Sequence, residues 1–572
     1  MLRWSKLAAA AATILVFASC NLNVENPNAP DAPRAFKDPA GLAELLGGAF
    51  RTWVETRDNY YVMPLDAMAD NYTASWNNAA MRFYSSVGSD CPVRCGFTNS
   101  ATAPEAAGGP TVEALWYGYY SVNSSASDIL AAVKGGLCFD DNCAVDSTQT
   151  VRNKAVAKML QGMALAGIAM VYDQGFIVDE NTDLSNIGSL PFAPRAEVRD
   201  SALSKLNQAY ALAGVMAWST PPEWMGLGSG TSYSNTQIQQ LIRTMQAELI
   251  ALWPRNGTEN AAADWATVAT YASQGISTGT PFQWQFYIDV TSRECGIDCI
   301  KNWGNSIGTE RVDTRVAHML TVPPAQHLDP WPSTGNPCPY TSNDKRVGDG
   351  SYGPSDNFNG YATVTATANA GTDYACSGVA IFPPARGSYH QSNMQHIRYH
   401  DLASRGEDLP TDDGTGQDVF YTPQMNDLLW AEALIRSGGN KVTAAGLINN
   451  SRVGRGGLAA LTGAETDTVL YDALHYEQEI EFMGQGVDPY FNRRRINGLI
   501  PSTPRQMPVP AKELNILNRA VYTFGGPSAP DMSAPAGSSG YKPETVADRF
   551  NALQAARPSK LMHYLNSGGG LF

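Results

Sequence analysis

The chain has 572 residues, with 40 Lys and Arg against 54 Asp and Glu and a formal net charge of −14. This acidic balance, without a run of Lys and Arg, argues against a nucleic-acid-binding protein, and the length is enough for one large domain or several ordinary ones. The most apolar internal stretch, 155–171, contains Lys158 and Gln161, so it is predicted to be a buried helix and not a membrane span.

The N-terminus has the pattern of an export signal. Arg3 and Lys6 precede an apolar run over 7–17, which has signal-peptide length and falls short of the about 20 residues of a stable span. The run closes on Ala-Ser-Cys20, which resembles a bacterial lipobox whose cysteine becomes lipidated. We therefore predict a signal peptide over 1–19 and a diacylglyceryl and palmitoyl anchor on Cys20. An ordinary secretory signal that contains a cysteine is the alternative.

The other eight cysteines form an even set, mostly in close pairs, as in exported proteins with local disulfides. Zinc is the less favoured alternative, because the spacings come without neighbouring histidines. Small loops gain modestly from closure, so we expect the bridges to pin surface loops, with their connectivity left open. The disulfide candidates are Cys91, Cys95, Cys138, Cys143, Cys295, Cys299, Cys338 and Cys376.

The first helix is predicted directly after the export signal. Residues 20–38 are rich in Asn and Pro and predict an extended tether. Asp38 then suits an N-cap and Pro39 the first helical position. The helix that follows carries an apolar stripe of Leu42, Leu45, Leu46, Ala49, Phe50 and Trp53.

Helical periodicity recurs along most of the remaining chain. It is lost between 281 and 423, a region rich in Gly, Pro, Tyr and Trp, and 525–545 is predicted to be loop. Helix pairs with long irregular inserts are typical of a helical-repeat scaffold that carries a loop-built surface. The predicted helices are 112–133, 151–172 (apolar on most sides and therefore central), 196–212, 237–253, 261–276, 424–435, 441–450 and 469–483.

Several segments resemble the SusD/RagB family. The strongest are LLWAEAL at 428–434, LINNSRVGRGGL at 447–458, EQEIEF at 477–482 followed by Gly486 and DPYFNRR, and RQMPVPAKEL at 505–514. WYGYY at 116–120 and the NPN of the tether at 26–28 are similar to its upstream elements. Two departures are the lack of the usual Arg and Leu around Asp488, and Gly456 where the family often has Ala.

The resemblance implies a mainly α fold of four tetratricopeptide-like helix pairs with long irregular loops. It implies one SusD-like domain over 39–572, with a helical scaffold at about 39–280 and 424–520 and an irregular ligand-binding insert at about 281–423. It further implies a surface-exposed, outer-membrane lipoprotein of a Gram-negative-type bacterium. Such a protein binds oligosaccharides and delivers them, as a lid, to a SusC-type TonB-dependent transporter. Peptide binding on the same scaffold is the alternative, and an exported hydrolase is less favoured.

Catalytic and metal motifs give no competing assignment. HExxH and P-loop patterns are absent from the sequence, and no segment is interpreted as a nucleophile elbow or a dinucleotide-binding loop. His475 and Glu479 share a helix face, but one histidine and one carboxylate favour a structural pair. The predicted protein is a binding protein, not an enzyme, and has no cofactor.

Two acidic clusters are interpreted as structural. A Gly/Thr-rich loop could bind calcium, but its spacing misses the EF-hand pattern and a solvated loop is favoured; its carboxylates are Asp412, Asp413 and Asp418. A second cluster is predicted to form an ion-pair network instead of catalytic carboxylates. Its members are Glu477, Glu479, Glu481, Arg493, Arg494 and Arg495.

Loop aromatics are the candidate ligand contacts, because an aromatic ring covers the flat C–H face of a sugar while amides fix its orientation. Trp76, with Asn71 and Tyr72 just before it, ranks first, followed by Tyr287 and Trp303. Packing within the loop is the alternative for each. The other loop tryptophans are Trp218, Trp224, Trp284 and Trp331, and the tryptophans predicted in the helical core are Trp53, Trp116, Trp253, Trp265 and Trp430.

Overall fold

The fold is taken from a computed structural model, which describes only part of the chain. The described residues are 37–74, 80–85, 94–101, 109–185, 187–225, 231–279, 284–288, 299–304, 310–321, 341–354, 364–366, 371–377, 390–399 and 416–526, some of them by backbone alone. The predicted signal peptide, Cys20 and the tether up to residue 36 therefore lie outside the described residues.

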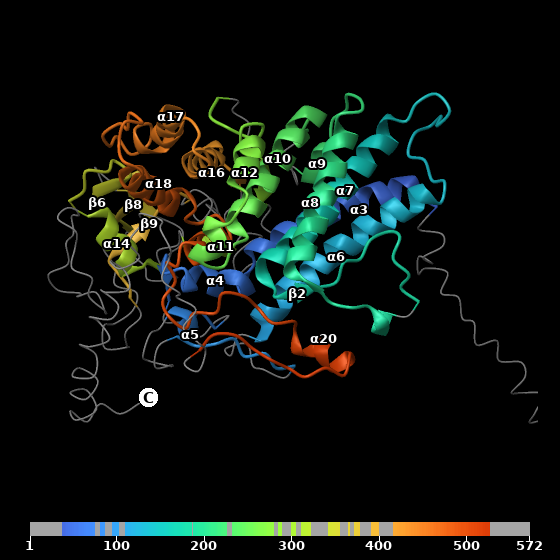
Figure 1. The fold of residues 1–572 in the computed structure, drawn as a ribbon, viewed down its shortest axis with the longest axis horizontal. Coiled ribbons are helices and arrows are strands. Elements are labelled where there is room, and N and C mark those ends of the chain that lie inside the picture. The colour runs from blue at the N-terminus through green and yellow to red at the C-terminus, as the bar shows by residue number, and fades with distance from the viewer. Residues whose placement is uncertain are drawn as a thin grey trace, which may run out of the picture.

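Helices dominate the molecule and confirm the predicted mainly α class (Figure 1). In the first part of the chain they are α3 (Pro39–Asp58), α4 (Met63–Met68), α5 (Met81–Ser85), α6 (Gly109–Lys134), α7 (Thr148–Val171), α8 (Arg195–Ala213), α9 (Pro222–Met225), α10 (Asn235–Leu252), α11 (Gly257–Ala261) and α12 (Trp265–Ala272). Later come α13 (Cys299–Gly304), α14 (Thr314–Leu320), α16 (Pro423–Arg436), α17 (Lys441–Arg452), α18 (Asp467–Glu481), α19 (Asp488–Arg495) and α20 (Ala511–Ile516). Short 3₁₀ turns occupy Tyr60–Val62 and Ile187–Ser189.

The long helices pack in chain order. α3 lies on α6, α6 on α7, α7 on α8, α8 on α10, α10 on α12, α12 on α16, and α16 on α17 and α18. Figure 1 shows α3, α6, α7 and α8 on one side of the molecule and α16, α17 and α18 on the other. Such a succession of helix pairs is consistent with the predicted repeat scaffold.

The start of α3 follows the sequence prediction. The Asp38 carboxylate accepts a hydrogen bond from the backbone N–H of Ala40 at 3.1 Å, and Pro39 is the first helical residue. Five of the six predicted stripe residues are buried, whereas Leu45 is 41% exposed. The apolar stripe is therefore narrower than predicted.

The central helix is α7, as predicted. It is long and apolar enough to cross a membrane by length and composition, as no other helix of the described residues is, but most of it is buried inside this fold. Two of its buried polar residues are paired with Glu180: the Lys158 Nζ lies 2.8 Å from the Glu180 Oε1, and the Gln161 Nε2 donates to the Glu180 Oε2 at 3.0 Å. These contacts allow α7 to carry a lysine in its interior.

One predicted helix, 261–276, is wrong in its bounds. The chain instead forms the short α11 and then a new helix, α12, that ends at Ala272. Asp264 separates the two, because its carboxylate accepts from the backbone N–H of Thr267 at 3.0 Å and so caps α12. A capping residue inside an apolar run was thus taken for a helical position.

The region between 281 and 423 contains short strands. β4 (Trp284–Ile288) pairs antiparallel with β10 (Gly416–Tyr421), and this pair is called the ribbon below. β5 (Arg311–Val312) pairs with β1 (Tyr72–Thr73). Outside this region, β2 (Gln174–Gly175) pairs with β3 (Ala193–Pro194). A four-stranded sheet has the order β7 (Val364–Ala366), β6 (Val347–Pro354), β8 (Tyr374–Ser377), β9 (Met394–His396). α13 and α14 also lie here and were not predicted, since so few turns give little periodicity.

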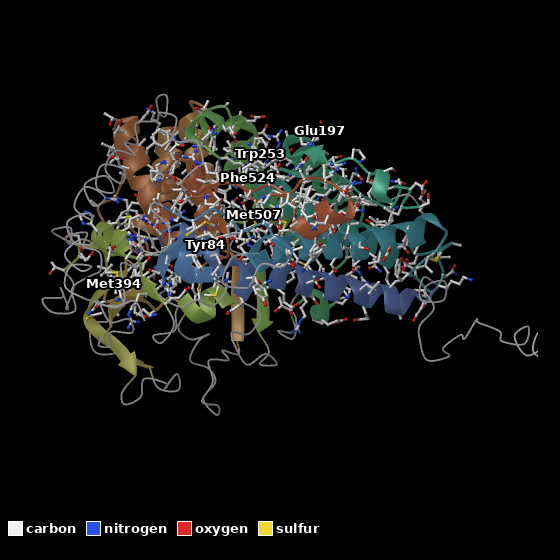
Figure 2. The ribbon with its side chains drawn as sticks, turned by 90° about the horizontal axis from the view of Figure 1, so that it is seen from below. Tyr84, Glu197, Trp253, Met394, Met507 and Phe524 are labelled. Atoms are coloured by element: carbon white, nitrogen blue, oxygen red, sulfur yellow. A yellow bond between two sulfur atoms is a disulfide. The ribbon has the colours of Figure 1, made fainter. Side chains whose placement is uncertain are left out.

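This region shares a core with the C-terminal helices. Tyr72, Val312, Tyr374 and Met394 cluster with Ile480 of α18. The C-terminal segment in turn returns to the helical body, where the N–H of Met507 donates to the carbonyl of Val171 at 2.8 Å. In Figure 2 Met507 lies within the molecule. Residues far apart in the chain therefore close one continuous structure.

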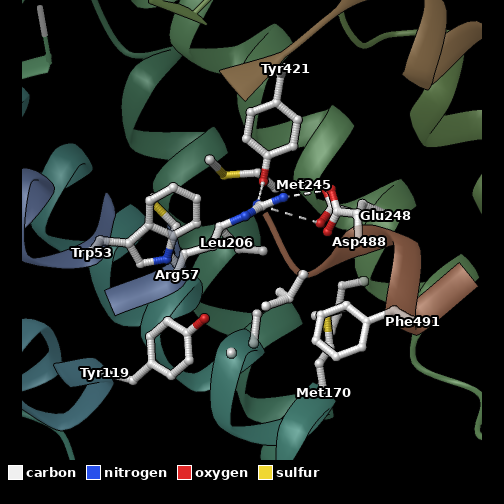
Figure 3. Close-up of a pocket in the computed structure, with 15 residues that line it drawn as sticks. Trp53, Arg57, Tyr119, Met170, Leu206, Met245, Glu248, Tyr421, Asp488 and Phe491 are labelled. Carbon is white, nitrogen blue, oxygen red and sulfur yellow. Dashed lines mark hydrogen bonds and ion pairs between the residues drawn. The ribbon is translucent and has the colours of Figure 1, made fainter. Parts of the chain in front are cut away.

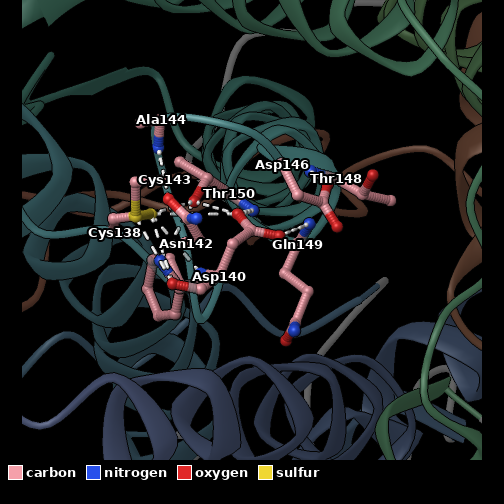
Figure 4. Close-up of a disulfide and its surroundings, with 10 residues drawn as sticks. Cys138, Asp140, Asn142, Cys143, Ala144, Asp146, Thr148, Gln149 and Thr150 are labelled. Carbon is pink, nitrogen blue, oxygen red and sulfur yellow. Dashed lines mark hydrogen bonds between the residues drawn. A yellow bond between two sulfur atoms is a disulfide. The ribbon is translucent and has the colours of Figure 1, made fainter.

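The cysteine prediction is confirmed for one local pair. Cys138 and Cys143 form a disulfide with each other before α7 (Figure 4). Cys95 and Cys376 each take part in a disulfide as well. Inside the closed loop, the Asp140 carboxylate accepts from the backbone N–H groups of Gln149 and Thr150 at 2.8 and 3.0 Å. The first turn of α7 is thus capped by a residue of the disulfide loop, whereas its N-cap residue makes no side-chain cap.

Candidate functional site

The two residues predicted just before Trp76 are buried. Asn71 and Tyr72 are each 1% exposed. The Asn71 Oδ1 accepts from Arg315 at 2.6 Å, and the Tyr72 hydroxyl is hydrogen-bonded to the His396 ring. Both side chains therefore hold the base of the loop, and a ligand contact by either stays a prediction. Trp76 itself lies outside the described residues.

The backbone is constrained on both sides of this loop. Asp70 has φ of 56° and Ala80 has φ of 63°, a region that non-glycine residues rarely adopt. Asp70 is fixed by two arginines: its Oδ1 lies 2.5 Å from the Arg94 Nη2, and its carbonyl accepts from the Arg315 Nε at 3.0 Å. This pairing stabilises the unusual backbone conformation of Asp70.

The other two candidates lie on neighbouring elements. Tyr287 lies in β4 opposite Gln417 of β10, and Trp303 lies in α13; their side chains are not described. α13 packs on the base of the Trp76 loop, because a Cβ at Gly304 would lie 2.7 Å from the ring of Tyr72. It also contacts the ribbon, where the Lys301 Nζ lies 4.6 Å from the ring centre of Phe420. The structure thus brings β1, α13 and the ribbon together.

A buried charged centre lies beneath the ribbon, and we call it the Arg57 centre (Figure 3). The Arg57 Nη2 lies 2.5 Å from the Asp488 Oδ2, and its Nη1 lies 3.8 Å from the Glu248 Oε1. The same Nη1 donates to the Tyr421 hydroxyl at 3.2 Å. Four elements, α3, α10, α19 and β10, thus meet at one guanidinium.

A cavity of about 40 Å³ adjoins the Arg57 centre, enough for a water molecule. Its apolar walls come from α7 and α8, including Met163, Met170 and Leu206. Gly486, at the turn before α19, has φ of 59°, and a Cβ there would overlap the Asp58 carboxylate. The turn of the family-like segment 486–488 therefore needs glycine to let α19 approach α3.

The charges of the Arg57 centre perturb one another. Burial, helped by the negative charge of Asp488, raises the pKa of Glu248 to about 8. Burial also raises the pKa of Asp488, although Arg57 opposes that shift. These shifts favour a proton on the Glu248 and Asp488 pair near neutral pH.

Among the comparisons with known proteins, only those with solved structures give matches. No family model and no curated protein matches the sequence. Solved structures do match. A SusD superfamily protein from Bacteroides vulgatus has a TM-score of 0.53 and 14% identity, over 84% of this chain and 97% of that one. One from Parabacteroides distasonis has a TM-score of 0.52 and 11% identity, over 83% and 97%.

A third match is a SusD-like carbohydrate binding protein from Bacteroides vulgatus, with a TM-score of 0.50 and 13% identity over 82% of this chain and 86% of that one. The chain has a SusD-like fold. The fold-level part of the predicted resemblance is thereby confirmed, at identities that carry the fold alone.

Within this SusD-like fold, the predicted acidic cluster of α18 is an ion-pair network with largely different partners. Of the three predicted arginines, Arg493 pairs with Glu479 at 3.1 Å. Arg495 instead pairs with Glu432 at 2.7 Å, and Arg494 donates to backbone carbonyls, including that of Met170 at 2.7 Å. The structural interpretation was right, and the predicted pairing was wrong for two of the three arginines.

Glu477 and Glu481 are held by arginines from elsewhere in the SusD-like fold. The Arg346 Nη1 lies 2.8 Å from Glu477 and 3.5 Å from Glu481, and Arg398 lies 3.0 Å from Glu481. Burial raises the pKa of Glu481, but Arg398 and Arg455 outweigh it and lower that pKa to about 2. These arginines belong to the irregular region and to the turn after α17, so sequence proximity could not identify them.

The glycine at 456 has a packing reason. A Cβ there would lie 2.8 Å from the Arg346 Nη2 and equally close to the carbonyl of Arg452. Arg346 is fully buried, and the same Nη2 pairs with Asp344 at 2.7 Å, so it has little room to move. The departure from the family pattern therefore makes space for a buried arginine.

The loop tryptophans divide between core and undescribed positions. Trp218, Trp224 and Trp284 are buried at 7%, 1% and 0% exposure, so the packing alternative holds for them. Of the predicted core set, Trp53, Trp116 and Trp265 are buried, whereas Trp253 and Trp430 are half-buried. The side chains of Trp76, Trp303 and Trp331 lie outside the described part of the chain.

The described part of the chain contains no group of three or more His, Cys, Asp and Glu that could hold a metal ion. The ring of His475 is hydrogen-bonded to Gln478 at 3.0 Å, and burial lowers its pKa to about 4. Asp412 and Asp413, and the side chain of Asp418, lie outside the described residues.

Proposed function

We propose that the protein is a glycan-binding lipoprotein of a nutrient-uptake system, not an enzyme. The observation that carries this proposal is the likeness, over about four-fifths of the chain, to a SusD-like carbohydrate binding protein. The adjacency of β1, α13 and the ribbon supports it, because these elements carry or adjoin Trp76, Trp303 and Tyr287.

The ligand is an oligosaccharide in this proposal, with stacking on Trp76 as its main apolar contact. Isothermal titration of the protein against a panel of oligosaccharides tests it, with a matched panel of peptides as the alternative. Trp76→Ala should weaken binding at least tenfold. Tyr117→Ala, which removes a 40% exposed aromatic on α6, is the control and should bind as the parent does. If the protein binds peptides and no oligosaccharide, the ligand is a peptide and the glycan proposal is wrong.

The proposed partner is a SusC-type TonB-dependent transporter of the outer membrane, above which this protein acts as a lid. Affinity purification of the natively expressed protein should recover a large barrel transporter in comparable amount. Repeated recovery of an isolated monomer would contradict the partnership. A broad glycosidase and peptidase screen tests the exported-hydrolase alternative, for which turnover would be decisive.

The proposed anchor is a diacylglyceryl and palmitoyl group on Cys20, with no contribution from calcium or another cofactor. Cys20→Ala should abolish labelling by a clickable fatty acid and move the protein out of the membrane fraction. A variant that stays in the membrane fraction would show that another feature holds the protein there.

A further inference from the structure

The Arg57 centre contains one carboxyl group more than its nearest cation can neutralise. Arg57 faces both Asp488 and Glu248, at 2.5 and 3.8 Å. Both carboxyls are buried beside this one guanidinium, so ionisation of both would leave it outnumbered, and burial raises the pKa of each. With a proton on one of them, Arg57 and the remaining carboxylate balance.

The surrounding described elements add one further carboxyl and one further cation, whose charge lowers the pKa of Asp488. α3 adds the buried carboxyl of Asp58, and α13 adds Lys301, which lies against the ring of Phe420. α6 and β10 add the phenols of Tyr119 and Tyr421, and the cavity walls from α7 and α8 are apolar. Counting these groups, loss of the shared proton leaves one uncompensated negative charge in a buried site.

The same centre is attached to the ribbon. The hydroxyl of Tyr421, the last residue of β10, accepts from Arg57 at 3.2 Å. The ring of Tyr421 stacks on Trp284, the first residue of β4, at 5.9 Å and 7° between planes. Trp284 also stacks on Trp53 of α3 at 5.5 Å. One residue, Tyr421, therefore joins the charged centre to both strands.

We propose that the proton shared by Glu248 and Asp488 is a latch on the ribbon, so that its loss loosens β4 and β10 and weakens ligand binding. The ligand-binding part rests on the proposed function. With the proton bound, the centre is neutral and holds Tyr421. Without it, the repelled carboxylates draw water into the adjoining cavity, and the contact of Arg57 with Tyr421 is lost.

Hydrogen exchange of the ligand-free protein at pH 6.5 and pH 9.5 tests the latch, with rates corrected for intrinsic exchange. The pH values lie on either side of the pKa of about 8 for Glu248. The amides of 416–421 should lose about tenfold in protection at the higher pH. Glu248→Gln keeps a donor toward Asp488 and should abolish that loss. Glu197→Gln, at an exposed position on α8 (Figure 2), should behave as the parent does.

A second variant covers the case in which Glu248→Gln does not fold. Tyr421→Phe keeps the ring stack and removes the hydroxyl that contacts Arg57, so ribbon protection should become independent of pH. Equal loss of protection in the parent and in both variants would overturn the latch, as would protection that does not change with pH in the parent.

Glycan titration at the same two pH values separates the latch from the proposed function. The dissociation constant should rise about tenfold at pH 9.5 in the parent and stay constant in Glu248→Gln. Ribbon protection that switches while affinity stays constant would overturn the coupling to ligand. A switching ribbon with no glycan bound at either pH would support the latch itself and count against the glycan ligand.

Discussion

The helical bundle has an apolar interior, whereas the region around α18 has a charged interior. In α6, α7 and α8 the interior is formed by apolar side chains such as Leu160, Leu165 and Leu206, each fully buried. Around α18 the interior contains Arg346, Glu477 and Glu481, also fully buried and paired across distant segments. The bundle is stabilised by apolar burial, which local periodicity specifies. The charged region depends on every partner being in place, because an unpaired buried charge is strongly destabilising.

Removal of one buried charge should have the largest effect on stability. Arg346→Met leaves Asp344, Glu477 and Glu481 without their shared cation and should lower the free energy of unfolding by about 3–5 kcal/mol. Urea denaturation with a shared slope measures it. Arg199→Met is the matched control, since Arg199 pairs with a 63% exposed Asp200 and should change stability by less than about 1 kcal/mol. Similar losses of unfolding free energy in the two variants would contradict the special dependence of the charged region on its buried partners.

A cavity in the bundle should cost nearly as much, but in a different way. Leu165→Ala in α7 should lower the free energy of unfolding by about 2–5 kcal/mol through lost burial and the cavity left behind. The loss should be the same at pH 4 and pH 8, because no titratable group is involved. A loss that depends strongly on pH would mean that the two regions are not independent.

Acid should weaken the charged region selectively. The pKa of Glu481 is lowered from 4.5 to about 2, so its pairing contributes stability above pH 4.5 and loses it as the pH falls toward 2. Glu479 and Glu432 shift in the same direction. Glu481→Gln should be less stable at pH 7 and should lose less stability than the parent between pH 5 and pH 2.5. Thermal melts over this range measure the difference, and parallel curves for parent and variant would contradict the assignment.

The smallest expected effects lie at the start of α7. Opening the disulfide by Cys138→Ser with Cys143→Ser should cost about 2 kcal/mol by freeing a short loop. Asp140→Ala should cost about 1 kcal/mol by removing the cap on Gln149 and Thr150. The combined variant should lose less than the two effects added together, because the opened loop no longer holds Asp140 at the helix. Strict additivity in urea denaturation would show that the disulfide and the cap act separately.

The candidate site was only partly predictable. The motif that placed Asn71 and Tyr72 beside Trp76 located a region that the structure connects to α13 and the ribbon, yet both side chains are buried. The Arg57 centre was not predicted, because its members are Arg57, Glu248, Tyr421 and Asp488, which lie in four separate elements. The available signal was a polar residue on the apolar stripe of a helix, as at Arg57 in α3 and Glu248 in α10. It indicates burial of a charge and gives no information about the partner.

The sequence by itself determined most of the long helices, the cap at Asp38 and the central position of α7, and its motif resemblance implied the SusD-like fold. The helices and the cap depend on periodicity and short-range hydrogen bonds, which involve residues a few positions apart. Only the tertiary structure decided that Arg346 pairs with Glu477 and Glu481, that Arg495 pairs with Glu432, and that Gly486 lets α19 approach α3. The physical reason is that electrostatic pairing depends on distance in space, and residues tens to hundreds of positions apart become neighbours only when the helices pack.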